Sequence, residues 1–284
     1  MNEPLREAPE FAGSDRKAQA RPVALVTGAS SGIGKAFAER LAYEGFDLVL
    51  VARDEARLTE LADRLRETVG CAVEVLPADL ADPAQCARVE RRLGSPDRVV
   101  ELLVNCAGHA LRKPFVATSV EDEQQLLDVH VRAVLRLTKA AVDTMCARRR
   151  GAVINVGSVA AWAPRGSYSA HKAWAVAFSE AVGAQTADRG VHVMALCPGY
   201  VHTELEQRAG MRTNRPGFAV IDPDRLVADA IRDLNRGRRV SVPTTRYAVF
   251  AAVLRHLPHR WTIPIKRWPP SAQPLPSSRA RPGP

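Results

Sequence analysis

The pentapeptide YSAHK, residues 168–172, places a phenol and an ammonium group four residues apart. On a helix these two positions lie on one face, one turn apart, so Tyr168 and Lys172 can share a pocket. A phenol with a pKa near 10 is a poor acid or base at neutral pH, and a neighbouring cation stabilises its phenolate. The pair therefore suits proton transfer to or from a substrate oxygen. A chance pairing on a surface helix is the alternative, and the rest of the chain must decide between them.

A second stretch that suits chemistry is TGASSGIG, residues 27–34, which follows an apolar run and opens a helical pattern. Its glycines allow a tight turn and the close approach of a ligand. The N-terminus of the helix offers N–H groups and a positive dipole end to a pyrophosphate. In this strand–turn–helix context we predict a dinucleotide site, against the alternative of a purely structural turn. We expect the contacts to come from Gly28, Ser30, Ser31, Gly32, Ile33 and Gly34.

The end of the next apolar run indicates which dinucleotide binds. An NAD site usually has an acid there, which accepts a hydrogen bond from the adenosine ribose. Ala52 occupies that position, and Arg53 follows with a guanidinium that can pair with a 2′-phosphate, assisted by Lys35. We therefore expect NADP as the cofactor. The alternative for Arg53 is a solvated loop arginine.

These residues need a scaffold, and the chain alternates short apolar runs with longer helical patterns. Such alternation implies parallel βαβ units, and near-continuous apolar strands imply that helices cover both faces of the sheet. We predict an α/β, Rossmann-type doubly wound parallel sheet of about seven strands. Strands are expected at 23–27, 46–52, 72–78, 100–105, 152–157, 191–197 and 239–243, and helices at 32–44, 54–69, 83–93, 120–147, 167–188 and 223–235.

Length and composition limit the class of protein. A chain of 284 residues with 46% hydrophobic and 25% charged residues is ordinary for a globular protein. The five cysteines are scattered and form no C-x-x-C pair, so we predict a cytoplasmic location and no metal site. The net charge is +9, yet ten basic residues follow Asp233 without any acid. The body is therefore near neutral, and nucleic-acid binding is not predicted.

Composition also divides the chain into four predicted parts. We expect a disordered leader at 1–21, a dinucleotide-binding and catalytic domain at 22–243, an amphipathic basic extension at 244–268 and a disordered tail at 269–284. No apolar run is long enough for a transmembrane helix. The extension has three alternative roles, which are packing within the protein, peripheral contact with an anionic membrane and binding to a partner subunit.

The motifs together resemble those of the short-chain dehydrogenase/reductase superfamily over roughly residues 22–243. They are TGASSGIG, NCAG at 105–108, Ser158 ahead of YSAHK, and CPG at 197–199 followed by Thr203. Within the superfamily, the chain is most similar to NADP-dependent ketone/alcohol oxidoreductases, a group that includes fatty-acyl and steroid ketoreductases. The resemblance implies hydride transfer between nicotinamide and a carbonyl or secondary alcohol of a substrate that we expect to be apolar.

The resemblance also implies roles for individual residues. Tyr168 becomes the acid and base, Lys172 lowers its pKa and holds the nicotinamide ribose, and Ser158 binds the substrate oxygen. The segment after Thr203 is expected to form a substrate lid, and the helices at 120–147 and 167–188 to associate in a homodimer or homotetramer. Further cofactor contacts are implied for Asp79, Leu80, Asn105, Ala107, Gly108, Tyr168, Lys172, Pro198, Gly199 and Thr203.

Two features depart from the family pattern. Relatives usually carry an asparagine in the helix after the fourth strand, supporting a water that relays protons to the lysine, and His130 stands there instead. The imidazole either takes over that role, disturbs the relay or only fills space. The loop between Ser158 and Tyr168 is short, and its Trp162 is either a substrate contact or a core residue. We interpret His171, inside YSAHK, as non-catalytic.

We therefore predict an NADP-dependent oxidoreductase. A catalytically weak or silent nucleotide-binding or interaction protein is the alternative, because a fold does not determine function and His130 replaces the usual asparagine. An isomerase that works by transient oxidation is a third hypothesis. The substrate is not predicted, because the loops at 109–118, 159–167 and 204–220 shape its pocket and loops are the least predictable regions.

Overall fold

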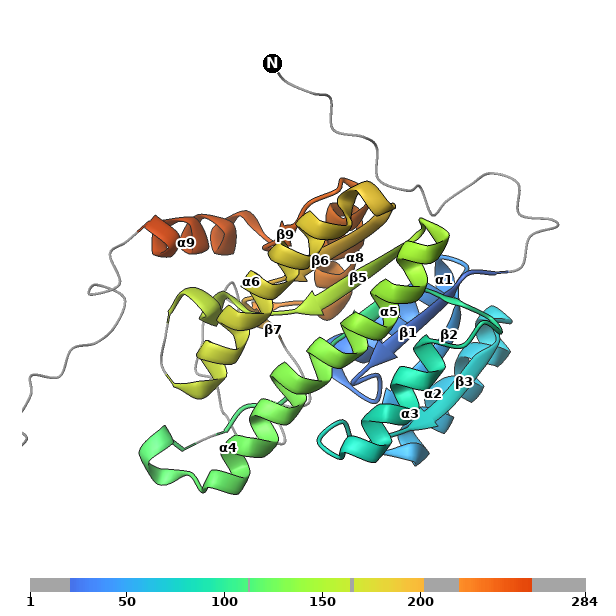
Figure 1. The fold of residues 1–284 in the computed structure, drawn as a ribbon, viewed down its shortest axis with the longest axis horizontal. Helices are drawn as coiled ribbons and strands as arrows, with labels where there is room; N and C mark the ends of the chain where they lie inside the picture. The colour runs from blue at the N-terminus through green and yellow to red at the C-terminus, as the bar shows by residue number, and fades with distance from the viewer. Residues whose placement is uncertain (1–20, 112, 164–165, 202–219, 257–284) are drawn as a thin grey trace, which may run out of the picture.

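The computed structural model describes residues 21–111, 113–163, 166–201 and 220–256. The predicted leader and tail, Thr203 and most of the expected lid lie outside these residues. In the described part, seven parallel strands form one sheet in the order β3-β2-β1-β4-β5-β6-β9, which confirms the predicted doubly wound fold (Figure 1). The strands are β1 (Val23–Thr27), β2 (Asp47–Ala52), β3 (Val73–Pro77), β4 (Val100–Asn105), β5 (Gly151–Val156), β6 (Val191–Leu196) and β9 (Val240–Ser241).

The strand order reverses between β1 and β4, and this reversal determines where a ligand can bind. From β1 the chain proceeds to one edge of the sheet through β2 and β3, then returns to place β4 against the other side of β1. The connections at the carboxyl ends of β1 and β4 therefore diverge, and we expect the ligand-binding crevice of such sheets between them. A separate short pair, β7 (Tyr200–Val201) with β8 (Val220–Ile221), was not predicted from the sequence.

Helices pack on both faces of the sheet. One core cluster joins the sheet to α1, α2 and α8, and a second joins it to α3 and α5. Four helix starts follow ordinary capping, since Asp54, Asp82, Ser119 and Asp222 each accept a backbone N–H of the turn that they open. The helices are α1 (Gly32–Tyr43), α2 (Glu55–Val69), α3 (Pro83–Leu93), α4 (Val120–Leu127), α5 (Val134–Arg148), α6 (Ser167–Thr186), α8 (Pro223–Asn235) and α9 (Thr245–His256).

The helix predicted at 120–147 is interrupted, and the interruption contains one of the predicted site residues. A π-helical segment, η2 (Asp128–Ala133), separates α4 from α5 and contains His130. A π-helical turn is a local widening of the hydrogen-bond pattern, and such turns are frequent at functional sites. The segment DVHVRA contains no glycine or proline that would indicate an interruption, and its apolar periodicity is helical. The sequence therefore predicted one continuous helix here.

The first part of the basic extension packs against the body of the protein. Tyr247 of α9 accepts a hydrogen bond on Oη from the backbone N–H of Tyr200, at 3.3 Å. The guanidinium of Arg255 lies 5.6 Å from the ring centroid of Trp162 and 3.6 Å from the carboxylate of Glu180. These contacts favour packing within the protein over the two other roles expected for the extension. Residues 257–268 lie outside the described residues.

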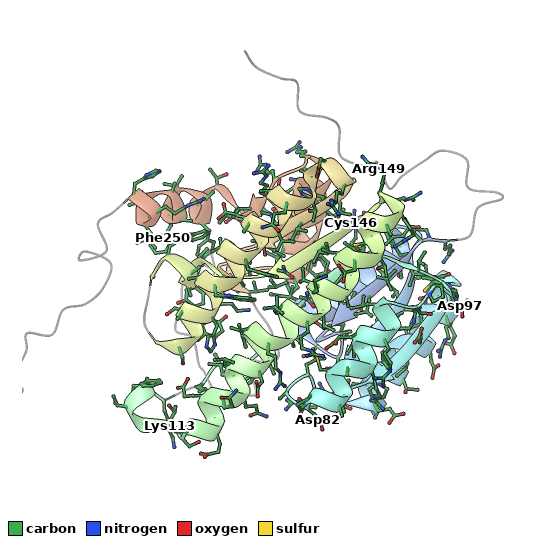
Figure 2. All side chains as sticks on the ribbon, viewed as in Figure 1. Asp82, Asp97, Lys113, Cys146, Arg149 and Phe250 are labelled. Carbon is green, nitrogen blue, oxygen red and sulfur yellow. The ribbon has the colours of Figure 1, made fainter. Side chains whose placement is uncertain are left out.

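The outer face of α9 is apolar. Figure 2 shows Phe250 on this helix, and its neighbours Val249 and Val253 are also exposed. None of the helices in the described ranges has the length and hydropathy needed to cross a membrane. Contact of this segment with a membrane surface stays a prediction.

Candidate active site

The glycine turn after β1 packs too closely for side chains. Gly28 has φ +69°, and a Cβ atom added there would lie 2.9 Å from the Cα atom of Ala107. A Cβ atom at Gly34 would lie only 2.2 Å from the carbonyl oxygen of Gly28. The turn therefore needs glycine both for its left-handed backbone and for contact with the start of α1.

A side chain that sequence reasoning missed fastens this turn to the loop after β4. The Oγ1 atom of Thr27, the last residue of β1, accepts hydrogen bonds from the N–H groups of Cys106 at 2.9 Å and Ala107 at 3.0 Å. Thr27 is buried, and it links the two loops on either side of the crevice. The sequence could have indicated this role, because Thr27 places a hydroxyl at the end of a strand, directly before a glycine turn.

The N-terminus of α1 suits an anionic ligand. Ser31 occupies the N-cap position without a side-chain hydrogen bond to the helix, and the first turn contains no acid. The first N–H groups of a helix have no partner within it, and here no side-chain cap satisfies them. A pyrophosphate would accept hydrogen bonds from these groups and interact favourably with the helix dipole, so the turn fits a dinucleotide.

The residues predicted to contact the adenosine follow β2 and β3. Arg53 is exposed directly after β2, close enough to lower the pKa of His109, which burial lowers more strongly. Asp54, the first residue of the helix expected at 54–69, is the N-cap of α2 and lies outside the helix itself. The Oδ1 atom of Asp79 accepts a hydrogen bond from the N–H of Ala81 at 2.9 Å. Leu80 is buried in the core, so its side chain is not available to a ligand.

Asn105 does not point its side chain toward the crevice. Its Nδ2 atom donates to Oδ1 of Asn155 at 2.9 Å and to Oγ1 of Thr138 at 3.2 Å, and Nδ2 of Asn155 donates to Oγ of Ser179 at 3.0 Å. This buried network joins β4, β5, α5 and α6 beneath the site. The expected contact of Asn105 with a cofactor is therefore left to its backbone and to the following residues, Ala107 and Gly108.

Tyr168 and Lys172 lie in the first turns of α6 and face each other as predicted. The Nζ atom of Lys172 is 5.7 Å from the ring centroid of Tyr168, and it donates a hydrogen bond to the carbonyl oxygen of Val156 at 2.7 Å. Burial lowers the pKa of Lys172 to about 8. The ammonium group is thus held at the end of β5, close to its point of titration.

Ser158 completes the group. Its side chain hydrogen-bonds Tyr168, and its Oγ atom also accepts the N–H of Ala160 at 3.1 Å. Burial raises the pKa of Tyr168, and the hydrogen bond with Ser158 opposes this shift only in part. We expected Lys172 to lower that pKa, but in the protein alone desolvation of the phenol outweighs other effects. Tyr168 therefore holds its proton at neutral pH and is ready to act as an acid.

The buried ammonium of Lys172 predicts a specific dependence of stability on pH. Between about pH 8 and the ordinary lysine pKa near 10.4, the folded protein has released this proton while the unfolded chain retains it. The unfolded state then binds more protons, so the free energy of unfolding should rise with pH. We expect a rise on the order of 1.4 kcal/mol per pH unit in this window.

The measurement is urea unfolding at pH 7, 8, 9 and 10, for the wild type and for Lys172→Met. Burial also raises the pKa of the Cys106 and Cys197 thiols, each to about 12. Both proteins retain these thiols, so the difference between them isolates the lysine. A difference that stays constant across this range would contradict the assigned pKa.

His130 lies against Tyr168. Its ring centroid is 5.5 Å from that of Tyr168, and its Nε2 atom accepts a hydrogen bond from the N–H of His109 at 3.0 Å. Burial, with an exposed fraction of only 2%, holds its pKa well below the usual 6.5. A Cβ atom at Gly108 would lie 2.9 Å from Cε1 of this ring, so Gly108 makes room for it.

Two further residues were predicted to contact the nicotinamide, and the structure shows what they pack against. The carbonyl oxygen of Pro198 accepts the N–H of Val159 at 3.0 Å, which joins the loop after β6 to the loop after β5. Gly199 packs under Tyr247, whose Cζ atom would be 2.2 Å from a Cβ atom there. Trp162 packs beside Val176 in a small core cluster, which favours its interpretation as a core residue.

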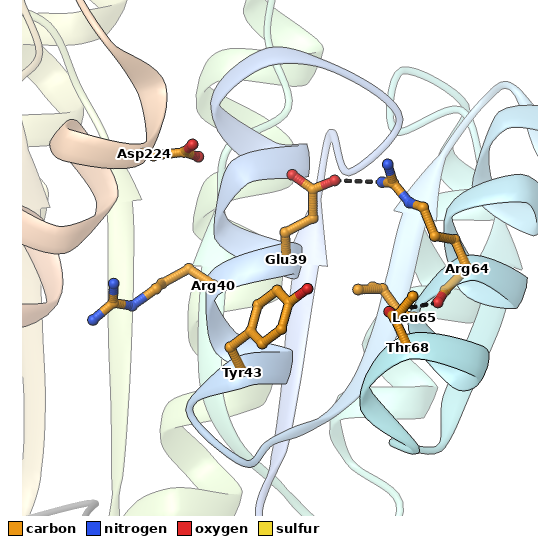
Figure 3. A pocket seen from close by; sticks show the side chains of 7 residues that line it. All are labelled: Glu39, Arg40, Tyr43, Arg64, Leu65, Thr68 and Asp224. Carbon is orange, nitrogen blue, oxygen red and sulfur yellow. Dashed lines mark hydrogen bonds and ion pairs between the residues drawn. The ribbon is translucent and has the colours of Figure 1, made fainter.

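A groove of about 430 Å³ lies elsewhere, between α1, α2 and the start of α8. Figure 3 shows that Glu39 and Arg64 form an ion pair across it. Its lining contains none of the predicted catalytic or cofactor residues, and consists of Glu39, Arg40, Tyr43, Arg64, Leu65, Thr68 and Asp224. We assign it no role in the chemistry.

Comparison with known proteins agrees with this geometry. Residues 22–213 match the family model described as short chain dehydrogenase. The 3-oxoacyl-[acyl-carrier-protein] reductase FabG of Escherichia coli is 32% identical over 203 residues, which cover 68% of this chain and 82% of the relative. A short-chain dehydrogenase from Sphingobium yanoikuyae, solved in complex with NADPH, is 39% identical with a TM-score of 0.77, covering 82% of this chain and 92% of that one.

A second solved structure is the bulky-bulky ketone specific alcohol dehydrogenase from Comamonas testosteroni. It is 30% identical with a TM-score of 0.72, covering 84% of this chain and 95% of that one. The matched range includes the glycine turn, Ser158, Tyr168 and Lys172. The chain belongs to the short-chain dehydrogenase family.

Proposed function

We propose that this chain is an NADP-dependent oxidoreductase that transfers a hydride between nicotinamide and a carbonyl or secondary alcohol. The observation that carries the proposal is the convergence of Ser158, Tyr168 and Lys172 at the carboxyl end of β5, in the same sheet whose β1 leads into the glycine turn. NADPH, when bound, supplies the hydride. Similarity to an NADPH complex and to ketone-reducing enzymes supports this choice of cofactor and reaction.

The side chains provide binding and proton transfer. The Ser158 hydroxyl is placed to hydrogen-bond the substrate oxygen together with the Tyr168 hydroxyl. In carbonyl reduction the O–H proton of Tyr168 passes to that oxygen, and in alcohol oxidation the phenolate takes it back. Lys172 is close enough to stabilise the phenolate once it forms, because the charge of an ammonium is little screened in a buried site.

We propose an apolar ketone or alcohol as substrate, since relatives include a 3-oxoacyl-[acyl-carrier-protein] reductase and an enzyme named for bulky ketones. Oxidation of NADPH, followed at 340 nm with a panel of bulky aliphatic and aromatic ketones, tests the function directly. Absence of turnover across the panel, despite NADPH binding, would favour the silent nucleotide-binding alternative. Cytoplasmic location and assembly into a homodimer or homotetramer stay predictions.

Arg53 should decide between the two nicotinamide cofactors. We expect Arg53→Asp to weaken NADPH binding by about 10-fold to 100-fold, because a carboxylate repels the 2′-phosphate that the guanidinium attracts. NADH binding should be retained or improved. Fluorescence titration with both cofactors measures the ratio of the NADPH and NADH affinities. Arg91→Asp, in the last turn of α3, is the control for the change of net charge. Equal weakening of both cofactors would mean that the ribose site is misplaced.

A further inference from the structure

Three unsatisfied polar atoms gather on one side of the catalytic pair. They are Nδ1 of His130, Nδ1 of His171 and Oε2 of Glu123, each buried without a hydrogen-bond partner among the described residues. Buried polar atoms without partners are rare in folded proteins, and each calls for an explanation. Only two other such side-chain atoms occur in the described ranges, so this grouping beside one site is not a general feature of the protein.

The three residues come from neighbouring elements, and His171 interacts with both of the others. The ring centroids of His130, in η2, and His171, in α6, are 6.3 Å apart. The carboxylate of Glu123, in α4, interacts electrostatically with His171 and hydrogen-bonds Ser167, the first residue of α6. We call these three residues the His130–His171–Glu123 cluster. A small polar group with several hydrogen bonds, such as water, suits the space between such atoms.

The cluster extends from the catalytic pair toward the surface. His130 is buried against Tyr168, whereas His171 and Glu123 are partly exposed. Its inner end therefore lies beside the phenol that loses a proton during carbonyl reduction, and its outer end is in reach of solvent.

The two histidines differ in what they can do. The Nε2 atom of His130 accepts the N–H of His109, so the neutral ring carries its hydrogen on Nδ1. Taking up a proton would place a second N–H against that backbone N–H, so His130 is restricted to donating from Nδ1. It orients an acceptor but does not carry a proton, which separates it from the relay role considered for this position.

His171, which we interpreted from the sequence as non-catalytic, has no such restriction, and the structure gives a reason to revise that interpretation. The charged and titratable groups that face it are Glu123 from α4, Lys172 from its own helix and His130 from η2. Burial and Lys172 lower its pKa, and the Glu123 carboxylate raises it. A partly exposed imidazole that interacts with a carboxylate can exchange protons with solvent.

We propose that the His130–His171–Glu123 cluster holds a short water chain through which His171 supplies the proton that replaces the one lost by Tyr168. The inference rests on the proposed function. Each carbonyl reduction moves one proton from the Tyr168 hydroxyl to the new alcohol and leaves a phenolate. His171 takes a proton from solvent, forms an imidazolium stabilised by Glu123, and releases that proton into the water chain, which reprotonates the phenolate. The imidazole returns to its neutral form, so one solvent proton is consumed per turnover.

The test uses the full chain with NADPH and the best ketone of the panel. His171→Ala and His171→Gln should lower kcat about 10-fold, less than loss of a direct acid, with little change in KM. The solvent deuterium isotope effect on kcat should increase in both variants. Added imidazole should restore the kcat of His171→Ala in a saturable way and leave the wild type unchanged. His192→Gln, at a histidine bonded to the carbonyl oxygen of Arg238 on the sheet edge, is the matched control.

Glu123→Gln gives a second, independent readout. Removal of the carboxylate should lower the pKa of His171, so the pKa that governs kcat should move to lower pH while the profile keeps its shape. If Glu123 has only a structural role, Glu123→Gln should lower the thermal stability of the protein without moving the pKa that governs kcat. If both His171 variants are folded and retain wild-type kcat, or if imidazole has no effect on a slowed His171→Ala, the proton path is wrong and the proposed function stands. If the wild type itself reduces no ketone, the proposed function fails, and the path with it.

Discussion

Tyr168→Phe is expected to lower the kcat for NADPH-dependent ketone reduction by about 10²-fold to 10⁴-fold. The variant keeps the ring that packs against His130 and loses only the hydroxyl that Ser158 hydrogen-bonds. Without that hydroxyl no group at this position can donate a proton to the substrate oxygen as the hydride arrives. NADPH binding should change little, because the phosphates are expected to bind at the distant glycine turn. The measurement is steady-state turnover together with a fluorescence titration of the cofactor.

Tyr43→Phe is the matched control, because Tyr43 lies exposed on α1, away from the catalytic residues. It should retain full activity. The comparison also separates the two classes of function proposed from the sequence, since a silent nucleotide-binding protein would show no turnover to lose. Turnover in Tyr168→Phe close to that of the wild type would remove Tyr168 from the mechanism.

Gly34→Ala should abolish tight NADPH binding and destabilise the protein. The added methyl group would lie 2.2 Å from the carbonyl oxygen of Gly28 and 2.6 Å from its carbonyl carbon, so the backbone of the turn must move. Overpacking of this kind costs about 1–3 kcal/mol, and a displaced turn no longer presents the N–H groups of α1 to the pyrophosphate. Urea unfolding and NADPH titration measure the two effects.

Gly94→Ala is the control for Gly34→Ala. It tests whether the losses of stability and NADPH binding depend on the position of the glycine or occur with any glycine-to-alanine substitution. A Cβ atom at Gly94 meets nothing nearer than the carbonyl oxygen of Glu90 at 3.6 Å, and the residue has an ordinary helical backbone conformation. It should keep wild-type stability and cofactor affinity. Normal NADPH affinity in a folded Gly34→Ala protein would show that the turn does not hold the pyrophosphate.

The local pattern of the chain determined most of the fold. Apolar runs separated by amphipathic stretches located the seven strands and five of the helices to within one or two residues, because burial of strands and helix faces requires those periodicities. The spacing of Tyr168 and Lys172 was sufficient to bring the two groups together, since α6 alone sets their separation. Motif order along parallel strands placed Ser158 and the glycine turn at the carboxyl edge of the same sheet.

Only the tertiary structure decided how side chains from different elements meet. Asn105 turns into the core because Asn155 lies beside it in the sheet register, and not toward a cofactor. The backbone of His109 decides the tautomer of His130, and the widened turn η2 brings that ring against Tyr168. The grouping of His171 with Glu123 depends on how α4 packs against α6. Sequence spacing does not specify such contacts, because they depend on the relative positions of elements that are connected only through distant parts of the chain.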